Sequence, residues 1–346
     1  MTKIAAHVQA FLQEYLPRQR GASPHTCDTY AYSYQLLFQF VAARHRIQPS
    51  QITLEQLDTQ MITDFLADLE SNRNCVASTR NVRLAAIKSF FRFLQYRLPA
   101  FMEQIRQILA LPAKKSDSTI IVHLDEKETK VLLRMPNIEE RMGIRDYAMI
   151  QLTLTAGLRV SELLGLRVED LILQPQASIR IKGKGRKERV LPLWKETTLC
   201  LKKWLAVRGD HDEPELFVNG KGQGMTRWGF SYILKKYVKQ ASEFCPSLKK
   251  KKVSPHVLRH SCAMVVYRAT HDIRKVAIWL GHNSIQTTEI YLRADQADKL
   301  DAIQAITPPK QRRGKFRAPD KLLSFLKTQT LCGANSSEAY TAKPVY

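Results

Sequence analysis

Apolar residues in the first third of the chain recur every three or four positions, the spacing that places side chains on one face of an α-helix. A first stripe comprises Ile4, Val8, Phe11, Leu12 and Tyr15, and a second comprises Tyr30, Tyr34, Leu37, Phe38 and Val41. Ser23 and Pro24 precede the second stripe as an N-cap and a first-turn proline. Thr59 is the expected N-cap of a third helix, whose inward residues are Ile62, Phe65, Leu66 and Leu69. We therefore predict a helical first domain.

A fourth helix is predicted from about Ser78 to Tyr96. Its apolar face is formed by Leu84, Ile87, Phe91 and Leu94. Other faces carry a threonine and a row of basic residues, namely Thr79, Arg80, Arg83, Lys88 and Arg92. A row of charges on a helix is usually a solvated surface. It can equally lie against the phosphates of a nucleic acid, and the pattern by itself leaves both interpretations open.

The segment from Leu111 to Thr119 is polar, contains proline, lysine and serine, and is typical of an interdomain linker. Beyond it the pattern is mixed, with helices expected over residues 125–133 and 144–155 and a break at Gly157. Residues 178–182 and 188–193 alternate around a Gly-Lys-Gly-Arg turn, which indicates a β-hairpin with Lys184 at its tip. A short strand is expected over residues 214–219, and helices from there to about residue 305.

The expected fold class is therefore mainly α-helical with a small antiparallel β-sheet. The expected parts are a helical domain over residues 1–112, a linker over 113–120, an α+β domain over 121–306 and an extension over 307–346. The extension begins with a basic, proline-broken tether. Asp320 is then positioned to cap a short helix with Leu322, Phe325 and Leu326 on one side, and the last ~15 residues are polar and expected to lack structure.

Charge narrows the range of partners. The 346 residues include 54 Lys and Arg against 32 Asp and Glu, a net charge of +22, and the isoelectric point is about 9.8. Such an excess favours a polyanion, and nucleic acid above all, as the partner. The alternative from charge alone is a basic protein with no nucleic-acid partner. A hydrophobic content of 44% is ample for two buried cores.

The six cysteines are scattered, with no Cys-x-x-Cys pair and no Cys/His spacing that suits a metal ion, so no metal or other cofactor is expected. They are typical of free thiols in a reducing compartment. No apolar run approaches the ~18 residues of a membrane span, and the amino-terminus lacks the pattern of a signal peptide. We therefore expect a cytoplasmic protein with no membrane partner.

Four short segments carry the candidate chemistry. They read TAGLRVSELLGL over residues 155–166, KGKGRKERVLPL over 182–193, PHVLRH over 255–260 and LGHNSIQTTEIY over 280–291. Cleavage of a phosphodiester without metal needs a nucleophile, cations at the non-bridging oxygens, a proton donor for the leaving oxygen and a proton acceptor for the nucleophile. These segments contain a candidate for each of the four groups.

Arg159 and Arg259 are the candidate phosphate ligands, because a guanidinium can hold two phosphate oxygens at once. For either arginine alone, a surface salt bridge is the simpler interpretation. Lys184, at the hairpin tip, is the candidate acid, and the alternative there is a solvated basic turn.

His256 lies three residues before Arg259, so the two share a helix face, and His256 is expected to accept or relay the nucleophile's proton. His260 is rotated by about 100° from Arg259, and we interpret it as a buried structural histidine. His282 follows Gly281, a helix-stopping residue, and is expected to emerge in a turn.

Tyr291 is the candidate nucleophile, on a helix expected to begin near Asn283 or Ser284. The tyrosines at 232, 237 and 267 lack its TTEIY context and its distance from His282. Core packing is the alternative role for Tyr291. A phenol with an ordinary pKa near 10 needs electrostatic help at neutral pH, which two arginines and a histidine can supply.

Together the four segments closely resemble the catalytic boxes of the tyrosine recombinases, also called phage-type integrases. The resemblance reaches to about residue 300 and is strongest from Ala156 onward. It implies that Arg159 and Arg259 clamp the scissile phosphate with His282 facing it. It also implies that Tyr291 attacks to form a 3′-phosphotyrosyl bond, without ATP.

The same resemblance makes Lys184 the general acid, because the GKGRKER match favours it over Lys182 and Lys187. Glu162 matches an acidic position that orients the arginine and histidine. The predicted helix from Ser78 resembles the last helix of the family's core-binding domain, which favours DNA contact by its basic face. The family exchanges strands within a tetramer on double-stranded DNA, so the resemblance implies double-stranded DNA as the partner and a homo-tetramer as the assembly.

One departure from the family pattern is Ala269-Thr270-His271, where a small, often glycine-containing turn is usual. The long extension after Thr307 favours a recombinase of a mobile element, with accessory proteins of that element as further partners and the prokaryotic nucleoid as its location. Two alternatives remain open: a topoisomerase of type IB that relaxes DNA with the same chemistry, and a DNA-binding accessory protein without activity.

Overall fold

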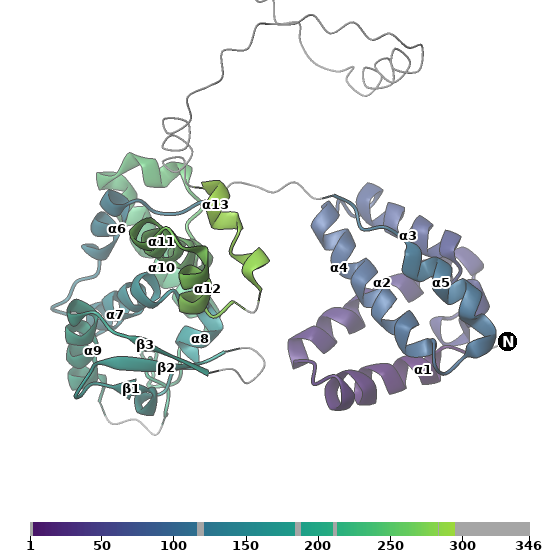
Figure 1. The fold of residues 1–346 in the computed structure, drawn as a ribbon, viewed down its shortest axis with the longest axis horizontal. Coiled ribbons are helices and arrows are strands. Elements are labelled where there is room, and N and C mark those ends of the chain that lie inside the picture. The colour runs from purple at the N-terminus through teal and green to yellow at the C-terminus, as the bar shows by residue number, and fades with distance from the viewer. Residues whose placement is uncertain (1–2, 116–120, 184–187, 210–212, 283, 295–346) are drawn as a thin grey trace, which may run out of the picture. The chain divides into compact units, whose positions relative to one another are not determined.

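The computed structural model describes residues 3–115, 121–183, 188–209, 213–282 and 284–294 (Figure 1). The chain forms two compact units, Met1–Thr119 and Ile120–Tyr346. Helices dominate both, and the second unit also contains a small antiparallel sheet, so the predicted fold class is confirmed. The predicted tether, terminal helix and tail lie outside the described residues. No helix among the described residues is long and apolar enough to cross a membrane.

The first unit is a helical bundle around one apolar core. Its helices are α1 (Ala5–Ala10), a π-helical continuation (Phe11–Gln19), α2 (Pro24–His45), α3 (Thr59–Ser71), α4 (Ala77–Leu94) and α5 (Met102–Ala110). The Phe11 ring packs 5.3 Å from that of Phe90 on α4. The buried Tyr34 hydroxyl of α2 donates to the Ala86 carbonyl at 2.7 Å. Aromatic packing therefore joins the first, second and fourth helices.

Helix starts in this unit follow from capping residues. Ser23 caps α2 by accepting from the Thr26 amide, with Pro24 in the first turn, as predicted. The predicted cap of α3, Thr59, is wrong by one residue. Asp58 caps that helix, because its carboxylate accepts from the Met61 amide at 2.7 Å.

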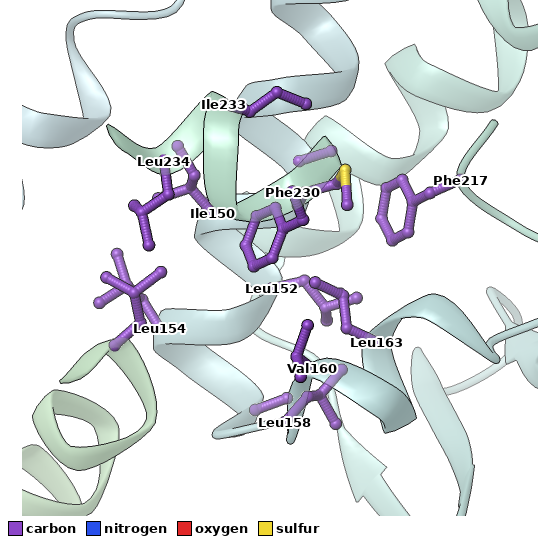
Figure 2. Close-up of a cluster of buried hydrophobic side chains, with 14 of the residues drawn as sticks. Ile150, Leu152, Leu154, Leu158, Val160, Leu163, Phe217, Phe230, Ile233 and Leu234 are labelled. Atoms are coloured by element: carbon purple, nitrogen blue, oxygen red, sulfur yellow. The ribbon is translucent and has the colours of Figure 1, made fainter. Parts of the chain in front are cut away.

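The second unit surrounds α7 with helices. They are α6 (Glu126–Leu133), α7 (Arg141–Ala156), α8 (Val160–Leu164), α9 (Lys195–Arg208), α10 (Arg227–Phe244), α11 (Pro255–Thr270), α12 (Ile273–Leu280) and α13 (Ile290–Ala294). Figure 2 shows side chains of α7, α8 and α10 meeting in the core, including Leu152, Leu163 and Phe230. All three side chains are inaccessible to solvent. The buried α7 thus holds its neighbours in place.

Three strands form a sheet in the order β1-β2-β3, all antiparallel. The predicted hairpin is confirmed as β2 (Ser178–Lys182) and β3 (Glu188–Pro192), paired from Ser178↔Pro192 to Lys182↔Glu188. The short β1 (Leu171–Ile172) was not predicted. Its two residues are too few to show an alternating pattern.

The predicted strand over residues 214–219 is wrong. Only isolated bridges form there, Arg167↔Glu215 and Val218↔Gly224. Leu216, Phe217 and Val218 are all buried, so this segment is a short core-filling connection in which consecutive side chains point inward. Apolar composition indicated a strand, but the chain turns at Asn219 before a ladder can extend.

The single helix predicted before Tyr291 is also wrong. The chain forms a 3₁₀ turn, Ile285–Thr287, capped by Ser284, and then begins again as α13. Tyr291 is the second residue of α13, and its amide donates to the Thr288 carbonyl at 3.0 Å. Two consecutive threonines at this point disfavour a continuous helix, since β-branched side chains lose rotamer freedom there.

Candidate active site

Two helices end beside each other at the centre of the second unit. Each ends in a glycine with left-handed backbone, Gly157 after α7 at φ 62° and Gly281 after α12 at φ 64°. A Cβ on Gly157 would lie 2.5 Å from a methyl of Leu280, the last residue of α12. The close approach therefore requires glycine for its backbone and for its lack of a side chain.

Arg259, on α11, joins these two helix ends. Its Nη1 donates to the Gly157 carbonyl at 2.6 Å and its Nη2 to the Leu280 carbonyl at 2.8 Å. Carbonyls at helix C-termini lack intrahelical donors and carry partial negative charge. The side chain is 4% exposed. Burial first, and then the charge of Arg159, lower the pKa of Arg259 to about 10.

Arg159 lies between α7 and α8 and is more accessible. Its Nη1 donates to Oε1 of Glu162 at 2.6 Å, and its Nη2 lies 3.4 Å from the Gly281 carbonyl. The Arg159 amide also donates to Glu162 Oε2 at 3.0 Å, which closes the first turn of α8. With 33% of its side chain exposed, Arg159 presents donors to solvent while its carboxylate partner fixes its direction.

Glu162 is the anion of the cluster. Three guanidiniums surround its carboxylate: Arg159, Arg189 at 2.9 Å from Oε2, and Arg259 at 3.7 Å. Burial alone would raise the pKa of Glu162, but hydrogen bonds from Arg189 and Arg159 and the charge of Arg189 lower it. The carboxylate is therefore held as an anion. Glu162 does contact Arg159, the contact on which its predicted orienting role depends.

Arg189, on β3, is the member of this cluster that the sequence did not predict. It lies within the KGKGRKERVLPL segment, but it is one of several basic residues there. Its side chain is only 14% exposed. The only sequence signal was its position in β3, opposite the buried Ile181 of β2.

His282 follows Gly281 and is held by Thr288. The His282 Nδ1 lies 2.8 Å from the Thr288 hydroxyl, and Thr288 is fully buried. Burial first, and then the charges of Arg259 and Arg159, lower the pKa of His282 to about 4. The imidazole is therefore neutral at neutral pH. Thr288 is a second residue that the sequence did not single out, although it belongs to the TTEIY segment.

His256 is exposed at the start of α11. Partial burial lowers the pKa of His256, and so do the charges of Arg227, Arg259 and Arg159. His256 is therefore close enough to the arginine cluster to feel its field. Among the hydrogen bonds of the described residues, none joins His256 to the Tyr291 hydroxyl.

The Tyr291 hydroxyl instead lies 3.0 Å from Nδ1 of His260. The sequence predicted a structural role for His260 because it is rotated from Arg259 around the helix. The tyrosine, however, packs on another face of α11, with Ala263, Met264 and Tyr267, which His260 shares. Tyr291 is 1% exposed, and burial raises its pKa to about 12 against the opposing effect of Arg259.

Lys184 lies outside the described residues. The paired part of its hairpin extends to Lys182 and Glu188, both exposed. Among the described residues, no group of His, Cys, Asp or Glu is arranged to hold a metal ion.

The predicted DNA-contact residues lie along α4 in the first unit, and three of them contact their own chain. Lys88 donates to the Leu111 carbonyl at 2.5 Å, and Arg80 to the Pro112 carbonyl at 3.5 Å. The Arg83 guanidinium lies over the Tyr32 ring at 5.3 Å. Thr79 is half-buried, and Arg92 is exposed.

Comparison with known proteins identifies the family. The family model described as the phage integrase family matches residues 123–298, and that of the N-terminal SAM-like domain of phage integrases matches residues 8–97. The chain belongs to the phage integrase family. The protein is a tyrosine recombinase, an enzyme of site-specific DNA recombination.

Known recombinases match this chain over nearly its whole length. The putative integrase/recombinase y4rC of Sinorhizobium fredii is 38% identical, with 94% of this chain and 99% of the relative covered. The tyrosine recombinase XerC of Pelobacter propionicus is 31% identical, with coverage of 90% and 98%. The crystal structure of the XerH recombinase bound to its difH substrate before cleavage is 25% identical, with a TM-score of 0.60 and coverage of 85% and 83%. Recombinases among these relatives favour recombination over the topoisomerase and accessory-protein alternatives.

Proposed function

We propose that this recombinase cuts DNA by attack of the Tyr291 phenol on a phosphodiester, which forms a 3′-phosphotyrosyl bond and frees a 5′ hydroxyl. The observation that carries the proposal is the contact between the Tyr291 hydroxyl and a neutral histidine, within the field of Arg259 and Arg159. A phenol needs both an acceptor for its proton and nearby cations to react at neutral pH. The reverse attack by a 5′ hydroxyl rejoins the strand.

The two arginines hold the phosphate in different ways. Arg259 is fixed by two carbonyls, which use two of its five N–H donors and leave the others for a non-bridging oxygen. Arg159 is partly exposed and presents its free donors beside it. Together they neutralise charge that develops on the phosphate oxygens in the transition state.

The histidines divide the proton chemistry. His260 Nδ1 is the first acceptor of the phenolic proton, and His256, one helical turn earlier on α11, passes it toward solvent. When the Thr288 hydroxyl donates to Nδ1 of His282, the proton on that ring lies on Nε2 and can be donated to the phosphate. Lys184 protonates the leaving 5′ oxygen, a role supported by its sequence context.

The domains and the assembly are assigned roles that suit a DNA substrate. Residues 1–112 would form a DNA-clamping domain that contacts the duplex through Thr79, Arg80, Arg83, Lys88 and Arg92, joined by residues 113–120 to the catalytic domain at 121–306. Strand exchange requires cleavage of four strands, which a homo-tetramer on DNA supplies. Residues 307–346 extend past the matched family region, which supports a mobile-element recombinase with accessory partners, acting at the nucleoid in the cytoplasm.

The test of the chemistry is a suicide DNA substrate, whose nick beside the scissile phosphate lets the 5′-hydroxyl fragment diffuse away. The trapped adduct should map by peptide mass spectrometry to Tyr291. An adduct on another tyrosine, or none on a bound cognate site, would overturn the proposal.

The test of the assembly is truncation after Ile306. Binding to a single site should remain. Tetramer formation on DNA, measured by sedimentation, and strand exchange should weaken. The reason is that the lost face of Leu322, Phe325 and Leu326 is too small to fold alone and would dock on a neighbouring subunit. A normal tetramer with full exchange would rule out a linking role for the extension.

A further inference from the structure

We propose that Arg189 is a positioning residue for phosphate binding: it neutralises Glu162, so that the charges of Arg159 and Arg259 remain available to the transition state. The inference rests on the proposed phosphate-binding role of those two arginines. It assigns a function in the reaction to a side chain of the hairpin that need not touch the DNA.

The first observation is the fork between Arg189 and Glu162. The Arg189 Nη2 lies 2.9 Å from Oε2 and its Nη1 3.3 Å from Oε1, so both carboxylate oxygens are engaged. Arg159 reaches the same two oxygens through its side chain and its amide. Arg189 therefore meets the carboxylate as a second, independent cation, and Arg159 does not have to neutralise it alone.

The second observation is the charge of the cluster. Three guanidiniums surround one buried carboxylate, a net charge of two positive units. A phosphodiester attacked by a phenolate passes through a state with two negative charges, because the anionic nucleophile adds to an already anionic phosphate. Without Arg189 the cluster would have one positive unit, and Glu162 would oppose the developing charge at short range.

The third observation is the position of Arg189 against Gly281. A Cβ on Gly281 would lie 2.7 Å from Arg189 Nη1 and 3.1 Å from Cζ, so the guanidinium rests on the bare backbone of this glycine. Gly281 also offers its carbonyl to Arg159 and precedes His282. Arg189 thus fixes the turn from which His282 projects and whose carbonyl lies beside Arg159.

Loss of a salt bridge that only stabilises the hairpin should affect cleavage differently from loss of Arg189. Arg180, on β2, provides the matched control, because it pairs at 3.3 Å with the buried Asp170, the residue just before β1. Arg180 is paired with Val190 in the ladder, and Arg189 with Ile181, so the two arginines point to opposite faces of the hairpin. Loss of Arg180 removes a hairpin ion pair without removing charge from the cluster.

The experiment compares cleavage of a normal phosphodiester with cleavage of a methylphosphonate, in which an uncharged methyl group replaces one non-bridging oxygen. On the normal substrate Arg189→Gln should slow cleavage by about ten- to a hundred-fold, in the range of one lost charge-stabilising group. On the methylphosphonate the slowing should be much smaller. Arg189→Lys, which keeps the charge and loses the fork, should retain more activity than Arg189→Gln, and Arg180→Gln should behave like the wild type on both substrates.

Adding Glu162→Gln to Arg189→Gln decides between charge and structure, because it restores the net charge of two. The double variant should cleave the normal substrate faster than Arg189→Gln alone. Equal slowing of Arg189→Gln on both substrates, with no gain from the double variant, would overturn the inference. Arg159→Gln serves as the reference for the proposed function: if methylphosphonate does not relieve its defect, the phosphate-binding assignment itself fails.

A variant that unfolds would be recognised by its thermal melting curve. In that case Arg189→Lys, the mildest change, carries the test. Because lysine keeps the positive charge, any slowing should be small and similar on the two substrates, and a folded Arg189→Lys protein slowed by about ten-fold or more on the phosphodiester alone would contradict the role of Arg189.

Discussion

The hydroxyl of Tyr291 lies 3.0 Å from Nδ1 of His260, and both residues are largely withdrawn from solvent. The neutral form of His260 is strongly favoured, because burial and the nearby charges of His256 and Arg259 lower its pKa to about 4. The resting protein therefore pairs a protonated phenol with a neutral imidazole, the state from which a proton can pass from oxygen to nitrogen.

Replacing Tyr291 with phenylalanine should abolish the covalent adduct and leave DNA binding unchanged, because only the attacking oxygen is lost. Stability should fall by about 1 kcal/mol, the usual cost of one hydrogen bond to a buried partner. Adduct formation on a suicide substrate and a binding titration measure the two effects. Tyr232→Phe, a change at an exposed tyrosine of α10, is the control and should form the adduct normally.

Acid should destabilise the protein through His260 and His282. Both have a pKa of about 4 in the folded state, below the ordinary 6.5. The folded state therefore binds fewer protons, so stability is complete above about pH 6.5 and falls as the pH drops toward 4. Each histidine should contribute roughly 1–2 kcal/mol of this loss at about pH 5.

Unfolding in denaturant at about pH 7 and pH 5 measures this dependence. His260→Asn and His282→Asn should each flatten it, whereas His45→Asn, at an exposed position on α2, should not. A wild-type stability that does not change between the two pH values would contradict the burial of neutral histidines.

Gly157→Ala should destabilise the catalytic unit by about 1–3 kcal/mol, through the cost of a left-handed backbone and of a displaced neighbour. Its Cβ would lie 2.5 Å from the Leu280 side chain. The same change should slow cleavage, because the Gly157 carbonyl holds Arg259. Gly220→Ala, where no atom lies within 4 Å of the added methyl, should melt like the wild type.

Lys184→Ala should slow cleavage of a normal substrate by about 10²–10⁴-fold, the usual contribution of a general acid. The defect should shrink on a 5′-bridging phosphorothiolate, whose sulfur leaves without a proton. Equal slowing on the two substrates would remove Lys184 from this role. Lys182→Ala, at the last paired position of β2, is the neighbouring control.

A chelator should leave cleavage intact, because the proposed chemistry uses arginines and histidines in place of a metal ion. Cleavage measured in excess EDTA should match that in its absence. Loss of activity in EDTA, restored by added magnesium, would contradict the mechanism.

Local signals predicted much of the fold. Ser23 with Pro24, and the glycines at 157 and 281, mark helix ends because their effect on the backbone is local. The hairpin was predicted for the same reason, since alternation and turn residues lie within one short segment. The break at residues 285–290 was missed because the two threonines only disfavour a continuous helix, and the position of the break also depends on where Tyr291 packs, which is a tertiary contact.

The candidate site also divides into residues that local sequence predicted and contacts that it did not. Residue types and spacing indicated Arg159, Arg259, His282 and Tyr291, and the structure brings them to one place. The partners of these residues could not be predicted, because the contacts of Arg189 with Glu162 and of His260 with Tyr291 join segments distant in the chain. Burial of a cation or a histidine is decided by such contacts and leaves little trace in local sequence.

The contact of Arg189 with the bare backbone of Gly281 also bears on how this protein can vary during evolution. While an arginine occupies position 189, a side chain at 281 would push its guanidinium aside and disturb its contact with Glu162, so a substitution at 281 is better tolerated after the arginine has been replaced by something shorter. Even then the left-handed backbone of Gly281 penalises every residue with a Cβ. The two positions should therefore be inherited as a pair, and lineages that lose the arginine should be the ones in which the glycine begins to drift.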